Sequence, residues 1–453
     1  TLVRELRRSG PPIAFQLLGI LLAGWLLAGI VSTRPLSLVV GGALAAGFLL
    51  LFLANPATGL LLVLLARAST DATLRLLTAA DPRGGVIGGL PNIGLVLILT
   101  FAGGLYILSR GVPLISLAGG RLLTLLLVTG FLGVMRSDSL LFSMNEWVPL
   151  LASFVIYALA AHLFASPRQM QRVVDVIAAS FILPAAFGVY QLATGGGVIR
   201  PGFSVRGVFG TFVHPNAFGF FLVTVIALFL GQAFFQAGRR RVAAVAGLCI
   251  ALVLLMGTYA RVAWAGALAV LFVVGILRAR ILLLVLPFAI LITLGLVPSV
   301  GGRLTDALAG GGTLGHRLLT LWPATLGAWL SATGAEGGTF QVALNRLAGL
   351  GPGIGQALGH YGLEGLPHND YLRVLVEYGI FGLTLYLALI SVLAVMAFRT
   401  WREFRERNQA AAAVALSFFS LTLAFPVMSI TDNIFAHTAN QVYFWTLAGL
   451  TVA

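Results

Sequence analysis

The feature that most constrains this chain is a series of apolar runs, many close to the roughly 20 residues that a helix needs to cross a bilayer. Only 9% of the residues are charged, against roughly 25% in soluble domains. The runs lack the alternation of β-strands, so we expect an all-α polytopic membrane protein that forms one integral membrane domain over residues 1–453. The predicted spans are 12–31, 36–54, 57–66, 90–108, 121–135, 147–165, 172–193, 216–236, 242–257, 262–277, 281–298, 371–398, 411–430 and 434–452. The runs at 57–66 and 121–135 are the weakest, so twelve spans fit as well as fourteen.

Arginines in the short loops predict the orientation. Four loops rich in arginine alternate correctly along the chain, so the positive-inside rule places them and both termini in the cytoplasm. No cleavable signal peptide is evident, and Arg4, Arg7 and Arg8 are typical of a cytoplasmic flank before a retained first span. Because the arginines are divided among many loops, we expect no nucleic-acid binding. The four loops contain Arg168 and Arg172; Arg239, Arg240 and Arg241; Arg278 and Arg280; and Arg399, Arg402, Arg405 and Arg407.

The same alternation places residues 194–215, 258–261 and the long loop region 299–370 on the opposite face. Arginine there runs against the positive-inside rule, so each one is a functional hypothesis, with snorkelling to lipid phosphate as the alternative. Within the long loop, residues 314–330 and 340–350 have the apolar spacing of helices, and we expect them to lie at the membrane interface and cover a cavity. The arginines on this face are Arg200, Arg206, Arg261, Arg303, Arg317 and Arg346.

Histidine at the mouth of a predicted span is the strongest catalytic signal. Pro367-His368-Asn369-Asp370 ends the long loop, and nine residues separate Asn369 from Gly379, with Gly382 three positions later. Imidazole exchanges a proton near neutral pH, so His368 is a candidate general base or acceptor-positioning residue. The alternative is that His368 caps the following helix. His214 is predicted to be a local helix cap, and His316 adjoins Arg317.

Neither a metal nor an organic cofactor is predicted. Cys249 is the sole cysteine and lies within a predicted span, so it can form no disulfide or zinc cluster. His360, Glu364, His368 and Asp370 lie near one another in sequence, but their spacing matches no known metal site. The glycine run from Gly349 to Gly362 lacks the Gly-Lys-Ser/Thr ending of a phosphate-binding loop.

The order of several sequence motifs resembles that of the superfamily of O-antigen ligases and polymerases, and most closely that of the lipopolysaccharide O-antigen ligases. The resemblance covers roughly residues 195–400. The residues that carry it are Arg206-Gly207-Val208-Phe209-Gly210, Pro215-Asn216-Ala217-Phe218, Ala260-Arg261, Arg317 with Trp322, Gly351, Gly353 and Gly355, and His368-Asn369 with its two downstream glycines. The position of Ala260 is often serine in relatives.

The resemblance implies a C-type glycosyltransferase fold with its active site at the periplasmic face of the bacterial inner membrane. The donor would be an O-antigen glycan on undecaprenyl pyrophosphate, and the acceptor the lipid A–core oligosaccharide. Transfer would be inverting and metal-independent, since the first external loop, residues 32–35, lacks the acidic pair of metal-using enzymes. Within the same superfamily, an O-antigen polymerase and a protein O-oligosaccharyltransferase are alternatives. A lipid-linked glycan transporter is the alternative from another class.

Site residues follow from the same resemblance. Arg206 and Arg261 match the functional arginines of the family and His368 its essential histidine, and Arg317 is expected to join the arginines on the donor pyrophosphate. Guanidinium suits this task because it stays protonated and binds phosphate oxygens two at a time. Possible supporting residues are Asn369, Asp370, Arg303, His316 and Tyr259.

Overall fold

The chain is an all-α polytopic membrane protein, seen in a computed structural model that describes residues 46–79, 90–137, 140–199, 206–284, 315–332, 339–353 and 367–453. Six helices of the described part are long and apolar enough to cross a membrane, and four shorter apolar helices accompany them. The helices are α4 Pro56–Ala79, α5 Leu90–Arg110, α6 Gly120–Met135, α7 Leu140–Leu163, α8 Pro167–Ser180, α9 Ile182–Thr194, α10 Pro215–Phe235, α11 Gly238–Gly257, α12 Arg261–Leu277, α16 Trp322–Ala332, α17 Thr339–Ala348, α19 Asp370–Phe404, α20 Gln409–Ser429 and α21 Thr438–Val452.

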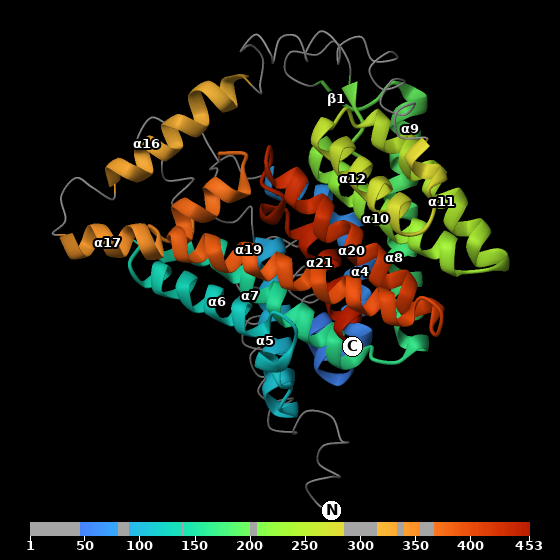
Figure 1. The fold of residues 1–453 in the computed structure, drawn as a ribbon, viewed down its shortest axis with the longest axis horizontal. Coiled ribbons are helices and arrows are strands. Elements are labelled where there is room, and N and C mark those ends of the chain that lie inside the picture. The colour runs from blue at the N-terminus through green and yellow to red at the C-terminus, as the bar shows by residue number, and fades with distance from the viewer. Residues whose placement is uncertain are drawn as a thin grey trace, which may run out of the picture.

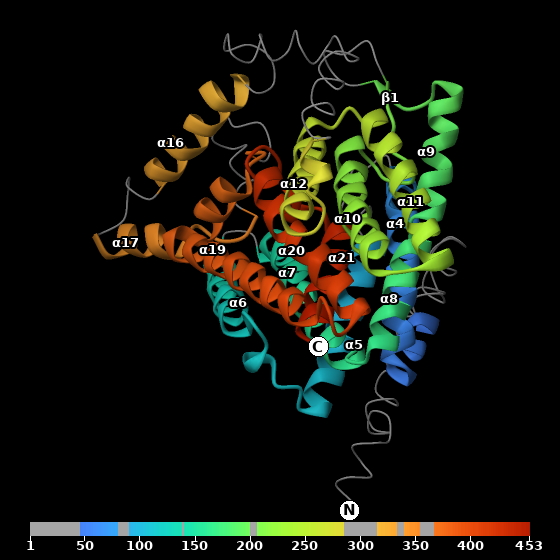
Figure 2. The same cartoon turned by 45° about the vertical axis from the view of Figure 1, so that its right-hand side comes forward.

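Helix α10 lies at the centre of the bundle and is buried along almost its whole length, as expected for a helix that is apolar on every side. It packs against α11, α12 and α20 (Figures 1 and 2). Phe221 of α10 contacts Tyr443 of α21, with ring centroids 5.1 Å apart. The Tyr443 hydroxyl donates to the Leu64 carbonyl of α4 at 2.9 Å, so α10, α21 and α4 are joined into one core.

Most predicted spans in the described residues are helices, with two differences in extent. The span predicted at 57–66 is longer in the structure, where α4 continues to Ala79. Arg67 of α4 is only 3% exposed, and it donates to the Thr438 hydroxyl at 2.8 Å, which satisfies one of its N–H groups inside the bundle. The span at 172–193 is divided at Phe181 into α8 and α9. Predicted spans 12–31 and most of 36–54 and 281–298 lie outside the described residues.

Helix α19 bends sharply at Gly379, which has φ 70°. There the chain crosses Gly349, with φ 78°, so closely that a Cβ on Gly379 would lie 2.3 Å from the Leu347 carbonyl oxygen. Leu350 and Gly351 donate their N–H groups to the Val376 and Glu377 carbonyls at 3.0 Å each. These bonds satisfy carbonyls near the kink, and the close crossing explains why glycine stands at this position.

The long loop region also contains the helices expected there. Residues Arg317–Leu321 form a π-helical turn that leads into α16, and α17 follows before the crossing at Gly349. A two-residue hairpin pairs β1, Val198–Ile199, with β2, Arg206–Gly207. In Figures 1 and 2 this hairpin lies at the upper end of α9.

Candidate functional site

The beginnings of three helices meet at one end of the bundle, which we call the His368 end. Asn216, in the first turn of α10, donates its side-chain amide to Asp432 at 2.7 Å. His368, just before α19, lies 3.3 Å from the other oxygen of Asp432. A Cβ on Gly219 of α10 would lie 2.7 Å from Ala263 and 3.2 Å from Ala260, so the start of α12 packs here as well. Two segments far apart in sequence, the starts of α10 and α19, therefore contact Asp432, and the start of α12 packs against α10 beside them.

His368 is held in an unusual backbone conformation. Its φ is +49°, in the left-handed region that non-glycine residues rarely occupy. Trp322 fixes one side by donating to the Pro367 carbonyl at 2.9 Å, and the Asn369 N–H fixes the other by donating to the Asn433 side chain at 3.0 Å. The imidazole is 46% exposed. Strained residues that their surroundings hold in place cluster at functional sites, so this conformation supports a functional role for His368.

The helix cap is the neighbouring residue. The side chain of Asn369 accepts the Leu372 N–H at 3.0 Å and is the N-cap of α19, so the alternative reading of His368 as the cap is wrong. The prediction for His214 is confirmed: it is the N-cap of α10, and its Nδ1 accepts the Asn216 N–H at 3.1 Å.

Asp432 is the polar centre of the site and was missed from the sequence. It is 4% exposed, and burial alone would raise the pKa of its carboxyl group. The hydrogen bond with His368 and the charges of His437 and His368 outweigh burial and lower this pKa to about 2. An ionised carboxylate only accepts hydrogen bonds, so the His368 Nδ1 is the donor in this pair, and in a neutral imidazole Nε2 would be the proton acceptor. The available signal was an acidic residue in the short break between the last two apolar runs.

Arg317 reaches the same centre from the long loop region. Its guanidinium donates to the Thr431 carbonyl, next to Asp432. Partial burial lowers the pKa of Arg317 while the Asp432 charge acts in the opposite direction, and a guanidinium stays protonated under both influences. Arg317 therefore contacts the segment that carries Asp432, the partner of His368.

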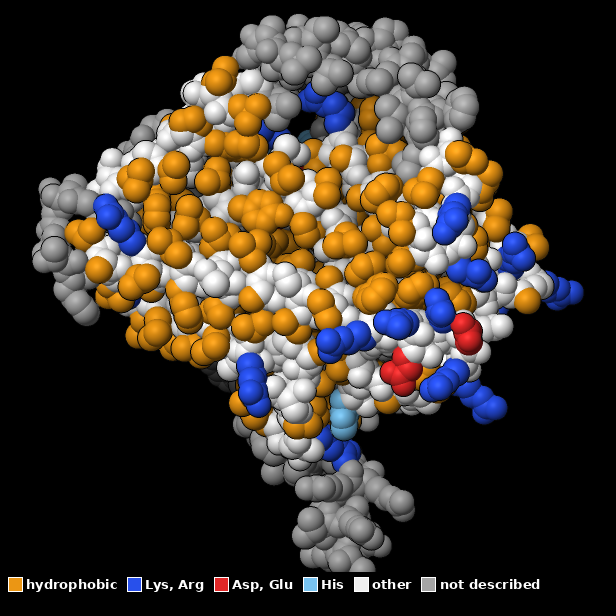
Figure 3. Space-filling view, in the orientation of Figure 1, with side chains coloured by type: hydrophobic (Ala, Val, Ile, Leu, Met, Phe, Trp, Pro, Cys, Tyr) orange, Lys and Arg blue, Asp and Glu red, His pale blue; other side chains and the backbone are white. Residues whose placement is uncertain are grey.

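Arg206 and Arg261 belong to two segments that are joined by the backbone. The Val208 N–H, two residues after Arg206, donates to the Gly257 carbonyl at 2.9 Å, and Gly257 ends the helix that precedes Arg261. The Gln191 side chain accepts the N–H groups of Phe209 and Gly210, both at 3.0 Å, and so holds this loop to α9. Arg206 is exposed, and Tyr259 has φ 51° in the turn before α12. In Figure 3 basic side chains lie around a hollow near the top of the molecule.

The remaining predicted residues are placed differently. Asp370 is 1% exposed and accepts hydrogen bonds from Ser429 at 2.8 Å and from the Ile434 N–H at 2.9 Å. It therefore anchors the loop that carries Asp432. His316 is exposed beside Arg317. Arg303, Gly355, His360 and Glu364 lie outside the described residues. Within the part of the chain that the structure describes, no cluster of three or more metal-ligating side chains occurs.

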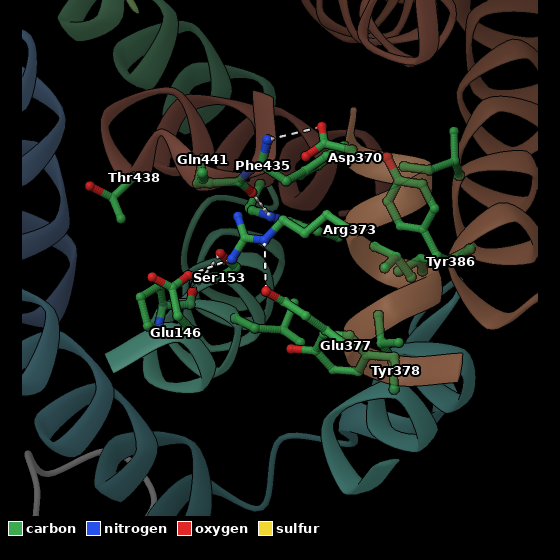
Figure 4. A pocket seen from close by; sticks show the side chains of 18 of the residues that line it. Glu146, Ser153, Asp370, Arg373, Glu377, Tyr378, Tyr386, Phe435, Thr438 and Gln441 are labelled. Carbon is green, nitrogen blue, oxygen red and sulfur yellow. Dashed lines mark hydrogen bonds and ion pairs between the residues drawn. The ribbon is translucent and has the colours of Figure 1, made fainter. Parts of the chain in front are cut away.

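A cavity of about 180 Å³ begins at Asp370 and contains a buried ion cluster that the sequence analysis did not identify. Arg373 donates to Glu146 of α7 and, at 3.2 Å, to Glu377 one helical turn away (Figure 4). The amide nitrogen of Gln441, which also lines the cavity, has no partner among the described residues. Arg373 and Glu377 at an i,i+4 spacing inside an apolar span were the available signal.

Replacement of Asp432 with asparagine should weaken the fold in a pH-dependent way. Its pKa is lowered from 3.8 to about 2, so the carboxylate stabilises the fold above pH 4, and this contribution disappears as the pH falls toward 2. We expect Asp432→Asn to lower the free energy of unfolding by about 2 kcal/mol at pH 5, where the carboxylate is ionised and imidazoles are mostly charged. Thermal unfolding in detergent at pH 5 and pH 3 measures this.

The control is Asp175→Asn, which removes an exposed pair with Arg240 and should change stability by at most about 1 kcal/mol. A gap between Asp432→Asn and the parent protein that is as large at pH 3 as at pH 5 would contradict the ionised state of Asp432.

Comparisons with known proteins identify no family for this chain. A scan against protein-family models found no matching family, and a search of curated proteins found no match.

Proposed function

We propose that the protein is a membrane glycosyltransferase of the O-antigen ligase type, which moves a glycan from undecaprenyl pyrophosphate onto the lipid A–core oligosaccharide. The observation that carries the proposal is the pair of His368 and Asp432 at the end of the bundle where Arg317 also contacts the Asp432 segment. A base held by a buried carboxylate beside a protonated guanidinium suits a reaction that removes a hydroxyl proton and releases an anion.

The base step uses the exposed edge of the imidazole. Nε2 of His368 takes the proton of the acceptor hydroxyl as its oxygen attacks the anomeric carbon of the donor. The bond from that carbon to the pyrophosphate oxygen breaks, and attack from the opposite side inverts the anomeric centre. Asp432 orients the ring through Nδ1 and stabilises the imidazolium that forms, which is the role of the carboxylate in a Ser-His-Asp triad. Such positioned proton transfer contributes roughly 10²–10⁴ in rate.

The leaving group requires positive charge. Pyrophosphate released next to a bilayer is costly to leave unpaired, and arginine neutralises it with two-point hydrogen bonds without losing its own charge. Arg206, Arg261 and Arg317 would supply this charge at the His368 end. We place this end on the periplasmic side of the bacterial inner membrane, within a C-type glycosyltransferase-like arrangement. The loops with Arg239–Arg241 and with Arg278 and Arg280 would then face the cytoplasm.

Lysine substitutions test the arginine arrangement. Arg206→Lys and Arg261→Lys keep the charge and lose the two-point geometry, so we expect each to weaken donor binding by about tenfold. Binding of undecaprenyl pyrophosphate to the purified variants measures this. Arg280→Lys, an exposed arginine after α12, is the matched control. Unchanged donor affinity in both variants would show that these arginines do not hold the pyrophosphate.

A transporter of lipid-linked glycans is the second candidate, and the buried Arg373 cluster favours it because charges within spans often mark transport pathways. Proteoliposomes that contain the purified protein, lipid-linked glycan and acceptor separate the two functions. The proposed ligase forms glycosylated acceptor and free undecaprenyl pyrophosphate, and does so in excess chelator. Glycan that crosses the bilayer while still linked to its lipid would indicate transport. Glycan added to a second lipid-linked glycan would indicate a polymerase, and transfer to protein an oligosaccharyltransferase.

A further inference from the structure

A groove of about 840 Å³ runs between the α8–α9 pair and the α10–α11 pair, away from the candidate site. Figure 2 shows α8, α9 and α11 on the same side of the molecule. Its walls are apolar and rich in small residues, including Ala178, Ala185, Ala186 and Ala246. Because these side chains are small, they leave space between the helices for aliphatic chains. The outer faces of these helices are also apolar.

The groove is closed toward the His368 end. A Cβ on Gly257 would lie 2.8 Å from the Leu192 side chain, and a Cβ on Gly188 would lie 2.8 Å from Leu254. Helices α9 and α11 are therefore in close contact at that end. Toward the opposite end the lining becomes polar, with Gln171, Gln232 and Arg240. An occupant must enter from the leaflet at that end.

The polar end has the features of an anion site. Arg239, Arg240 and Arg241 are exposed in the first turn of α11, whose N-cap Ala237 provides no side-chain hydrogen bond. The start of a helix attracts anions through its unpaired N–H groups. Asp175 pairs with Arg240 at 3.2 Å, but three arginines against one aspartate leave this end cationic.

The polar side chains at this end bond to one another. Gln171 donates to Asp175 at 2.8 Å and to the oxygen of Gln232 at 3.2 Å, and Gln232 is 6% exposed. The groove therefore offers a charged headgroup the exposed Arg240 and the start of α11.

We propose that this groove binds one anionic phospholipid, with its acyl chains against the alanine-rich walls and its phosphate at Arg240 and the start of α11. The net positive charge at this end selects an anionic headgroup over a zwitterionic one. Because the far end of α11 is bonded to the Arg206 loop through Gly257 and Val208, a bound lipid would also brace the helices that carry that loop. This inference is independent of the proposed glycan transfer.

Native mass spectrometry of the full-length protein tests it, with phosphatidylglycerol and phosphatidylethanolamine of identical acyl chains as probes. We expect one phosphatidylglycerol to be retained in preference to phosphatidylethanolamine. Arg240→Gln should reduce its occupancy about fivefold, and Ala246→Leu, which fills the groove, should reduce it as well. Arg402→Gln, an exposed arginine in the last turn of α19, should leave it unchanged. Thermal unfolding confirms that each variant is folded. Equal retention of both lipids, or occupancy unaffected by both groove variants, would overturn the proposal.

Discussion

Replacement of His368 with asparagine is expected to reduce the rate of glycan transfer by roughly 10²- to 10⁴-fold, the range for loss of a positioned general base. Asparagine is the suitable replacement because it tolerates left-handed backbone conformations better than alanine and so accommodates φ +49°. Donor binding should be nearly unchanged, since the arginines and not the imidazole hold the pyrophosphate. Single-turnover rates and donor affinity, measured on the same preparation, separate the two properties.

His214→Asn is the matched control. His214 lies at the same end of the bundle and caps α10, and asparagine is itself a good N-cap, so the rate should remain near that of the parent protein. If His368→Asn loses donor binding and rate to the same degree, His368 is a phosphate ligand and the general-base assignment is wrong.

Removal of the Arg373 charge should have the largest effect on stability. Arg373 is 8% exposed and pairs with both Glu146 and Glu377, so Arg373→Met leaves two carboxylates without their cation inside the bundle. Breaking a buried ion pair in this way costs about 3–5 kcal/mol. We expect a large fall in the thermal unfolding temperature and in the yield of folded protein.

Two further variants serve as comparisons for Arg373→Met. Arg240→Gln breaks the exposed pair with Asp175 and should change stability by at most about 1 kcal/mol. Arg373→Met combined with Glu377→Gln removes one of the two unpaired charges and should recover part of the loss. An unfolding temperature for Arg373→Met equal to that of Arg240→Gln would show that the cluster does not stabilise the fold.

Much of the helical framework was predictable because a bilayer sets one length scale for apolar runs. Helices α10, α11, α12 and α20 begin and end close to the predicted limits. Gly379, the first of the two glycines downstream of His368-Asn369, is the position of the kink in α19. The extent of α4 was not predictable. Arg67 looks like the end of a span in sequence, and Thr438, which accepts a hydrogen bond from it inside the bundle, lies 371 positions away.

The candidate site was predictable in its parts and not in its connections. Alternation of the loops predicted that Arg206, Arg261 and Arg317 share the face of His368, and of these Arg317 contacts the segment that carries Asp432. Nothing in the sequence indicates that Asp432, 64 positions after His368, completes the pair, because that contact depends on how α19 and α20 pack. The pairing of Arg373 with Glu146 was hidden for the same reason, since the two residues are 227 positions apart, whereas its i,i+4 pairing with Glu377 was visible in the sequence.

The position of the bound donor tests the central claim most directly. A cryo-electron microscopy reconstruction of the protein with an undecaprenyl-pyrophosphate-linked glycan would locate the two phosphates. We predict their density at the His368 end, in contact with at least two of Arg206, Arg261 and Arg317, with the anomeric carbon facing His368 Nε2. Density for the donor pyrophosphate and its glycan at the opposite end of the bundle, with none at the His368 end, would contradict the proposed active site.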